Sequence, residues 1–141
     1  MNRLILAVLA APLAACSQEP AANNGAEAAP PAAQASGALA SVDLTKPISG
    51  SGANPAWTIE IDGSQIRYAE GGAAPEAFAP AAPSVDVMAA TYATRNAKGE
   101  DVVVMLSPVS CEGPAGGAAR PLTVQMKIGA QIREGCAGPA Q

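Results

Sequence analysis

The stretch Leu122-Thr123-Val124-Gln125-Met126-Lys127-Ile128 shows the clearest structural pattern in this chain. Apolar side chains alternate with polar ones along its whole length, and a period of two is typical of a β-strand with one buried and one exposed face. Gly129-Ala130 follows and indicates a turn, after which residues 131–134 lead back toward Gly135-Cys136. We therefore expect a β-hairpin near the C-terminus.

The same period recurs upstream, on both sides of Asp62-Gly63, which is a favourable hairpin dipeptide. The residues expected on the inward face of this second hairpin are Trp57, Ile59, Ile61, Ile66 and Tyr68. Shorter signals indicate a first strand near residues 42–45 and a later arm opened by Val85 and Val87. Residues 91–94 either continue this arm or begin the next one. The continuous apolar run at residues 102–106 predicts a central strand that is buried on both faces.

Successive short strands separated by turn signals indicate an antiparallel all-β domain, either a small barrel or a sandwich, spanning residues 41–137. Segments rich in Ala, Pro and Gly at residues 71–83 and 112–121 are expected to be loops, although a short helix is compatible with residues 75–78. Residues 138–141 are expected to form a disordered tail.

The N-terminus has the layout of a secretory signal. Arg3 supplies a positive charge, residues 4–13 are apolar, and this segment is too short to span a bilayer as a helix. Leu13-Ala14-Ala15-Cys16 resembles the lipobox of bacterial lipoproteins. That resemblance implies removal of the signal peptide, residues 1–15, and attachment of diacylglycerol to the thiol of Cys16. The alternative is an ordinary signal peptide, with Cys16 left free or paired.

The composition of residues 16–40, which begin with the lipidated cysteine and are rich in Ala and Pro, predicts a disordered linker. As a flexible coil of about 24 residues, it would span roughly 25 to 30 Å. Ser17 follows the lipobox cysteine, where Asp would favour retention in the inner membrane by the enterobacterial sorting rule. We therefore expect the periplasmic face of the outer membrane rather than the inner membrane.

Charge and composition exclude several functions. The 141 residues carry 8 basic and 12 acidic side chains and no histidine. This acidic balance argues against nucleic acid as a partner and against electrostatic adhesion to anionic lipid. Without histidine or a Cys-x-x-Cys pair, a zinc site is a poor interpretation, and no hydroxyl group has a histidine to activate it. We expect no catalytic residues, no metal and no cofactor.

Two further cysteines remain if Cys16 carries lipid. In an oxidising compartment Cys111 and Cys136 would pair by default, and a closed loop of about 25 residues would contribute roughly 3 to 4 kcal/mol on the chain-entropy argument. Two unpaired thiols or a metal site are the alternatives.

The C-terminal third and the segment before Trp57 resemble a family of small, uncharacterised bacterial lipoproteins. The matching residues are Asn54-Pro55-Ala56-Trp57, Cys111-Glu112-Gly113, Arg120-Pro121, Gly129 and Gly135-Cys136. Asn54, Ala56 and residues 112–115 depart from the family pattern. The resemblance covers residues 42–136 and implies a disulfide between Cys111 and Cys136 on an envelope lipoprotein; it implies no known reaction.

Trp57 and Arg120 are the candidate binding residues. Trp57 could be an exposed anchor, but a core position beside the disulfide is favoured because the domain has few other large side chains. Glu60 and Asp62 share one strand face, as the paired acids of a carboxylate-dependent envelope hydrolase would, but their alternation is typical of a solvent-facing side.

We therefore expect a lipid-anchored envelope protein whose non-catalytic β-domain is a binding or structural module. Its partners would be the membrane, through Cys16, and an envelope protein or a peptidoglycan-related component. Size, anchor and disulfide are also similar to those of periplasmic lipoproteins that inhibit lysozyme. The inhibitors' Ser-Gly-x-x-Tyr loop is nevertheless not matched by residues 63–68, so this remains an alternative.

Overall fold

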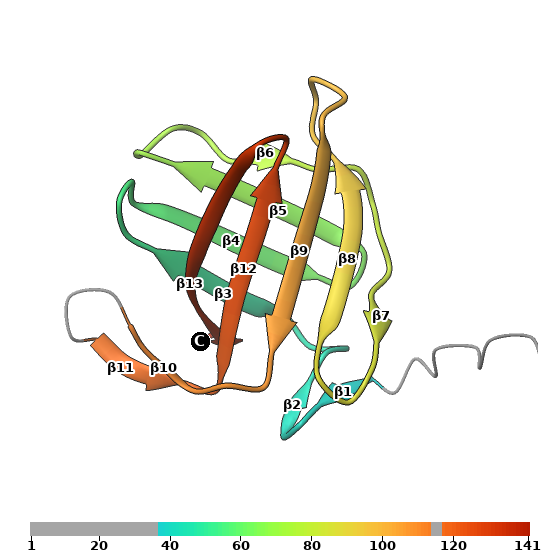
Figure 1. Ribbon diagram of the computed structural model, residues 1–141, viewed down its shortest axis with the longest axis vertical. Coiled ribbons are helices and arrows are strands. Elements are labelled where there is room, and N and C mark those ends of the chain that lie inside the picture. Colours follow the sequence, from blue (N-terminus) through green and yellow to red (C-terminus); the bar gives the residue numbers. More distant parts are fainter. Residues whose placement is uncertain (1–36, 114–116) are drawn as a thin grey trace, which may run out of the picture.

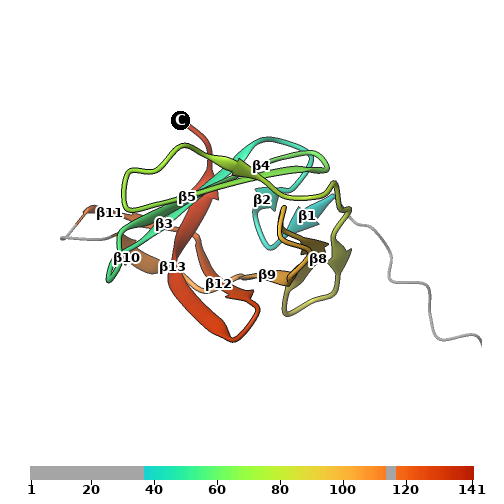
Figure 2. The same ribbon diagram turned by 90° about the horizontal axis from the view of Figure 1, so that it is seen from above.

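Nine strands form one antiparallel sheet that curls until its two halves face each other as an open half-barrel (Figures 1 and 2). This computed structural model describes residues 37–113 and 117–141, and within them it contains no helix. The all-β prediction is therefore confirmed. In sheet order the strands are β6 (Glu76–Ala77), β5 (Gln65–Glu70), β4 (Trp57–Asp62), β3 (Ile48–Gly52), β13 (Gln131–Pro139), β12 (Leu122–Ile128), β9 (Asp101–Ser107), β8 (Ala90–Arg95) and β7 (Ser84–Val85).

Two short ribbons accompany this sheet. β1 (Ala38–Leu39) pairs with β2 (Val42–Asp43), and β10 (Cys111–Gly113) pairs with β11 (Gly117–Arg120). The second ribbon replaces part of the loop predicted at residues 112–121. Residues 75–78, whose sequence is compatible with a short helix, contain β6 instead.

The two hairpins predicted from alternation are confirmed. Ile128 pairs with Gln131 across Gly129-Ala130, and Asp62 pairs with Gln65 across Gly63-Ser64. The first residue of each turn is a glycine with positive φ, 55° at Gly129 and 58° at Gly63, a conformation that glycine adopts without steric cost.

Two strand predictions are wrong in detail. Val102, Val104 and Leu106 are fully buried, but Val103 is 37% exposed, because it lies on the convex face of the curled sheet, which no described element covers there. The predicted burial on both faces therefore fails. β7 ends at Val85, and Val87 lies in the turn of residues 86–89, because the Asp86 carboxylate accepts the backbone N–H groups of Met88 and Ala89.

Both expected boundaries of the domain shift outward. Leu39 lies within the predicted linker, but it is only 1% exposed and packs in the core. The expected disordered tail is also wrong in part, because β13 continues to Pro139 and pairs there with Ile48 of β3. The signal peptide, Cys16 and the linker up to residue 36 lie outside the described residues.

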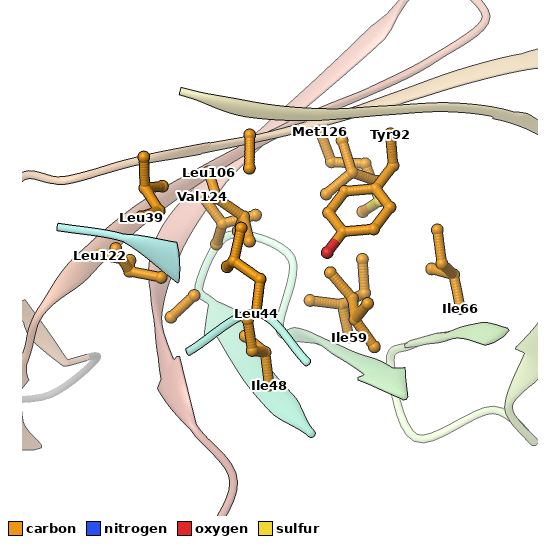
Figure 3. Close-up of a cluster of buried hydrophobic side chains, with 14 of the residues drawn as sticks. Leu39, Leu44, Ile48, Ile59, Ile66, Tyr92, Leu106, Leu122, Val124 and Met126 are labelled. Carbon is orange, nitrogen blue, oxygen red and sulfur yellow. The ribbon is translucent and has the colours of Figure 1, made fainter. Parts of the chain in front are cut away.

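The core lies between the two halves of the sheet (Figure 3). Its largest fully buried side chains are Leu39, Ile48, Ile59, Ile61, Ile66, Tyr92, Val102, Val104, Leu106, Leu122, Val124 and Met126. The ring of Tyr92 points from β8 toward Ile59 and Ile66 on the opposite half. Alternation thus places one face of every long strand against the same apolar interior.

β13 joins the two halves. Its first residues pair only with β12, Cys136 and Ala137 pair with both neighbours, and Gly138 and Pro139 pair only with β3. At this corner a Cβ on Gly135 would lie 2.1 Å from the carbonyl oxygen of Ser51, and one on Gly52 would lie 2.4 Å from that of Glu134. Only glycine permits this approach of the two backbones.

We expect Gly135→Ala to lower the free energy of unfolding by at least about 3 kcal/mol, because the new methyl group meets backbone on the facing strand. Gly99→Ala is the control, since its glycine has φ of +80° but open space around the Cβ position. It should cost between about 1 and 2 kcal/mol. Urea unfolding followed by Trp57 fluorescence measures both, and equal losses would contradict steric exclusion at the corner.

Candidate functional site

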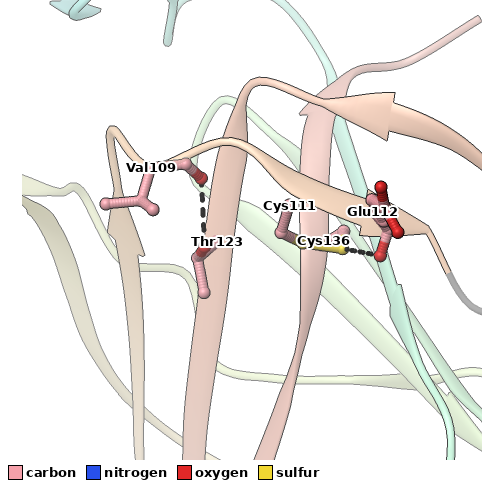
Figure 4. The surroundings of a disulfide bond; sticks show 5 residues. All are labelled: Val109, Cys111, Glu112, Thr123 and Cys136. Carbon is pink, nitrogen blue, oxygen red and sulfur yellow. Dashed lines mark hydrogen bonds between the residues drawn. A yellow bond between two sulfur atoms is a disulfide. The ribbon is translucent and has the colours of Figure 1, made fainter.

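The disulfide predicted between Cys111 and Cys136 is present, with Cα atoms 5.6 Å apart (Figure 4). It joins β10 to β13 beside the glycine corner and so fixes the β10–β11 ribbon to the main sheet. Thr123 Oγ1 donates a hydrogen bond of 3.0 Å to the carbonyl of Val109, which holds the segment that leads from β9 to the bridge. Closing a loop of 25 residues contributes roughly 3 to 4 kcal/mol on the chain-entropy argument.

Trp57 is not an exposed anchor. Its side chain is only 2% exposed, and its ring packs against the positions of Gly52 and Gly135 at the corner. The favoured core interpretation is confirmed, and the candidate binding role fails because no face of the indole reaches solvent. Its Nε1 is buried without a hydrogen-bond partner in the described part of the chain.

Arg120 lies in a different environment, at the end of β11. Its Nη2 donates to Ser49 Oγ at 2.7 Å and, at 3.4 Å, to the carbonyls of Gly138 and Pro139. Within residues 37–113 and 117–141 the guanidinium has no carboxylate partner, and no hydrogen bond from its Nε or Nη1 is found. The side chain therefore connects β11 to the end of β13, and its Nε and Nη1 donors remain available for a ligand.

A hollow of about 480 Å³ opens beside Arg120. Small side chains and backbone line the rest of it, from Ser51, Gly113, residues 117–119, Pro121 and residues 138–141. None of these lining residues has an acidic side chain, but Gln141, which also lines the hollow, carries the α-carboxylate of the chain. A guanidinium without an ion-pair partner among the described residues is suited to a carboxylate or another planar anion.

A second polar cluster joins strands that are not neighbours in the sheet, and sequence reasoning missed it. Arg133 on β13 donates to Glu70 on β5 through Nε at 2.9 Å and Nη2 at 3.2 Å. Tyr68 donates its hydroxyl hydrogen to the same carboxylate. Because β4 and β3 separate β5 from β13 in the sheet order, this cluster ties one half of the curled sheet to the other.

The environment of the cluster changes its protonation. Burial, and then the hydrogen bond to Glu70, raise the pKa of Tyr68 to about 12. The hydrogen bonds from Arg133, followed by that from Tyr68, lower the pKa of Glu70. The carboxylate is thus held charged and the phenol neutral, which is the state that keeps the tie intact.

A hollow of about 410 Å³ adjoins this cluster. Its acidic side chains already serve the fold, since Glu76 accepts the backbone N–H of Ala97 at 2.8 Å and Glu100 accepts the amide of Asn96 at 2.7 Å. The rings of Tyr68 and Phe78 stack beside them, with centroids 5.8 Å apart. Because the acidic side chains around this hollow already bond other parts of the domain, we do not assign it as a binding site.

The other candidates lie where alternation predicted. Glu60 and Asp62 are exposed on β4, and Glu60 lies 3.9 Å from Arg67 on the neighbouring strand. Tyr68, the tyrosine of the stretch compared with the lysozyme inhibitors, is 8% exposed and sits within β5 rather than in a loop.

In the described ranges no group of three or more His, Cys, Asp or Glu side chains is placed to hold a metal ion. None of the described residues belongs to a helix long and apolar enough to cross a membrane.

We predict that both tyrosines keep their protons in the folded protein at about pH 10, where a free tyrosine is half ionised. Burial also raises the pKa of Tyr92. Because the unfolded chain loses these protons first, stability is full below about pH 10 and declines as the pH rises toward 12.

A spectrophotometric titration of tyrosinate, with Trp57 fluorescence as the monitor of folding, tests this. Tyr68→Phe assigns the two ionisations, and Glu70→Gln should lower the pKa of Tyr68 because it removes the charged acceptor. Ionisation of a tyrosine near pH 10 in the folded protein would contradict the arrangement.

Comparison with known proteins adds nothing to this geometry: no protein-family model, no curated protein and no solved structure matches the chain.

Proposed function

We propose that this chain is a lipid-anchored protein of the bacterial cell envelope, and that its β-domain acts as a non-catalytic binding or structural module. The observation that carries the anchor is Leu13-Ala14-Ala15-Cys16 placed directly after an apolar signal segment. About 20 residues rich in Ala and Pro separate Cys16 from β1, a spacing that suits a tether.

The disulfide supports the same compartment. Structural disulfides persist outside the cytoplasm and are rare within it, so the bond between Cys111 and Cys136 agrees with export. Ser17 after the lipidated cysteine favours the outer membrane in an organism that follows the sorting rule. The family of small envelope lipoproteins that the motifs resemble is consistent with this location.

The hollow beside Arg120 is the binding surface that we propose. A guanidinium oriented by Ser49 and left without a carboxylate partner among the described residues favours the carboxylate of a peptide. Such a group occurs at the C-terminus of an envelope protein and on the peptides of peptidoglycan. Glu60 and Asp62, by contrast, lie exposed on the outer face of a strand and offer no enclosed acid pair.

Cys16→Ala should release the protein from the membrane fraction or leave the precursor uncut, because the acceptor of the lipid is gone. Mass spectrometry of the mature N-terminal peptide provides the direct measurement. The control is Ser17→Ala, which leaves the thiol in place and should remain membrane-bound. An unmodified Cys16 in the mature wild-type protein would refute the anchor.

For the binding surface we predict that acetyl-D-alanyl-D-alanine shifts the amide resonances of residues 117–120 and 138–140, because its carboxylate can pair with Arg120. The C-terminally amidated dipeptide is the matched control and should leave them unchanged. Arg120→Gln should weaken the response at least about tenfold through loss of the charge-assisted pair. Equal responses to the acid and the amide would contradict carboxylate recognition.

A further inference from the structure

The most exposed large apolar side chains in the described residues are at one turn. Val87 is 88% exposed and Met88 is 70% exposed, both between β7 and β8. We refer to these two residues as the apolar tip. Val109, 58% exposed, follows β9 at the same end, because the first residue of β8, Ala90, pairs with Leu106 near the end of β9.

The backbone holds the apolar tip outward. Asp86 Oδ1 accepts the N–H groups of Met88 at 2.7 Å and Ala89 at 2.8 Å, and the Asp86 N–H donates to the carbonyl of Ala89 at 2.9 Å. These bonds close a tight turn and direct the aspartate toward the backbone. The two apolar side chains are therefore presented in a fixed loop whose one carboxylate is already hydrogen-bonded.

The chain from Cys16 enters the domain at this same end. β1 lies at the same end of the domain as the β7–β8 turn, at the bottom of Figure 1. Gly37, the first described residue, directly precedes β1. Asp43 and Lys46, which follow shortly, balance each other in charge.

The opposite end of the β8–β9–β12 half is charged. The β8–β9 turn there carries Lys98 and Glu100, and Arg95 pairs with Asp101 at 3.0 Å beside it. Ile132, 58% exposed, lies near the β12–β13 turn at this charged end. The domain is thus polarised, with the apolar tip where the tether enters.

We propose that the apolar tip inserts into the boundary between headgroups and acyl chains of the membrane that carries the Cys16 lipid, so that the domain docks with this end toward the bilayer. The inference rests on the lipid anchor of the proposed function. Two apolar side chains bind a membrane weakly by themselves, but a short tether makes the contact intramolecular at a millimolar effective concentration. Removal of the signal peptide takes away Arg3, so the anchored protein has 7 basic and 12 acidic side chains, and this acidic balance disfavours attraction to anionic lipid.

The test uses the full-length lipidated protein in phosphatidylethanolamine and phosphatidylcholine vesicles with a spin-labelled quencher on the acyl chains. A fluorophore is attached at Val87→Cys or, as the matched control, at Ile132→Cys, which replaces an exposed apolar residue at the opposite end. We expect at least about threefold stronger quenching at residue 87 than at residue 132, unchanged by added salt. Met88→Asp should return the quenching at residue 87 to the control level.

The outcomes separate the two proposals. Protein that floats with the vesicles and shows equal quenching at both positions would overturn insertion of the tip and leave the anchor standing. Protein that does not float and carries an unmodified Cys16 would overturn both. A label at residue 87 that is shielded from aqueous iodide but not reached by the acyl-chain quencher would assign this end to a protein partner or a second copy, and it too would overturn the proposal.

Discussion

At Gly135 the backbone of β13 comes so close to the carbonyl oxygen of Ser51 that no side chain fits between them. This approach lets one strand change partners, from β12 to β3, and so turns a long sheet into two facing halves. The apolar interior exists only because the halves face each other. Trp57 fills the space behind the corner and packs against Gly52 and Gly135, the two positions that lack side chains there.

β13 also carries the groups that hold the curl in place. Arg133 donates hydrogen bonds to Glu70 on the far half. Further along the same strand, the carbonyl of Gly138 accepts a hydrogen bond from Arg120. Cys136 fixes the β10–β11 ribbon at the same level. The glycines supply the close approach, the Arg133–Glu70 contact ties the halves together, and the other two contacts fix the β10–β11 ribbon to β13. A domain with a modest apolar core depends on such ties more than a large one does.

Much of the fold could be predicted from the sequence because alternation and turn residues act locally. The hairpins around Gly63 and Gly129, and the buried position of Trp57, follow from neighbours within a few residues. The predicted burial of Val103 is wrong, because a run of apolar residues does not show that the convex face of the sheet is exposed at that position.

The polar contacts were beyond such reasoning. The tie between Glu70 and Arg133 joins residues 63 apart in sequence, and that between Arg120 and Ser49 joins residues 71 apart. Neither pair has a periodic signal, since only the curl brings the partners together. The apolar tip could not be predicted from the sequence either, because its proposed role depends on which end of the domain the tether enters. Local pattern therefore predicted the elements, and long-range geometry decided the candidate surfaces.

The open margins of the half-barrel have a consequence of their own. β6 and β7, which end the sheet on either side, are only two residues long, and prolines at positions 75, 80 and 83 flank them. Proline lacks the N–H that a further strand would need, and so short an edge offers few bonds to a neighbour. Many copies can therefore lie close together at high local density without pairing edge to edge into a continuous β-sheet.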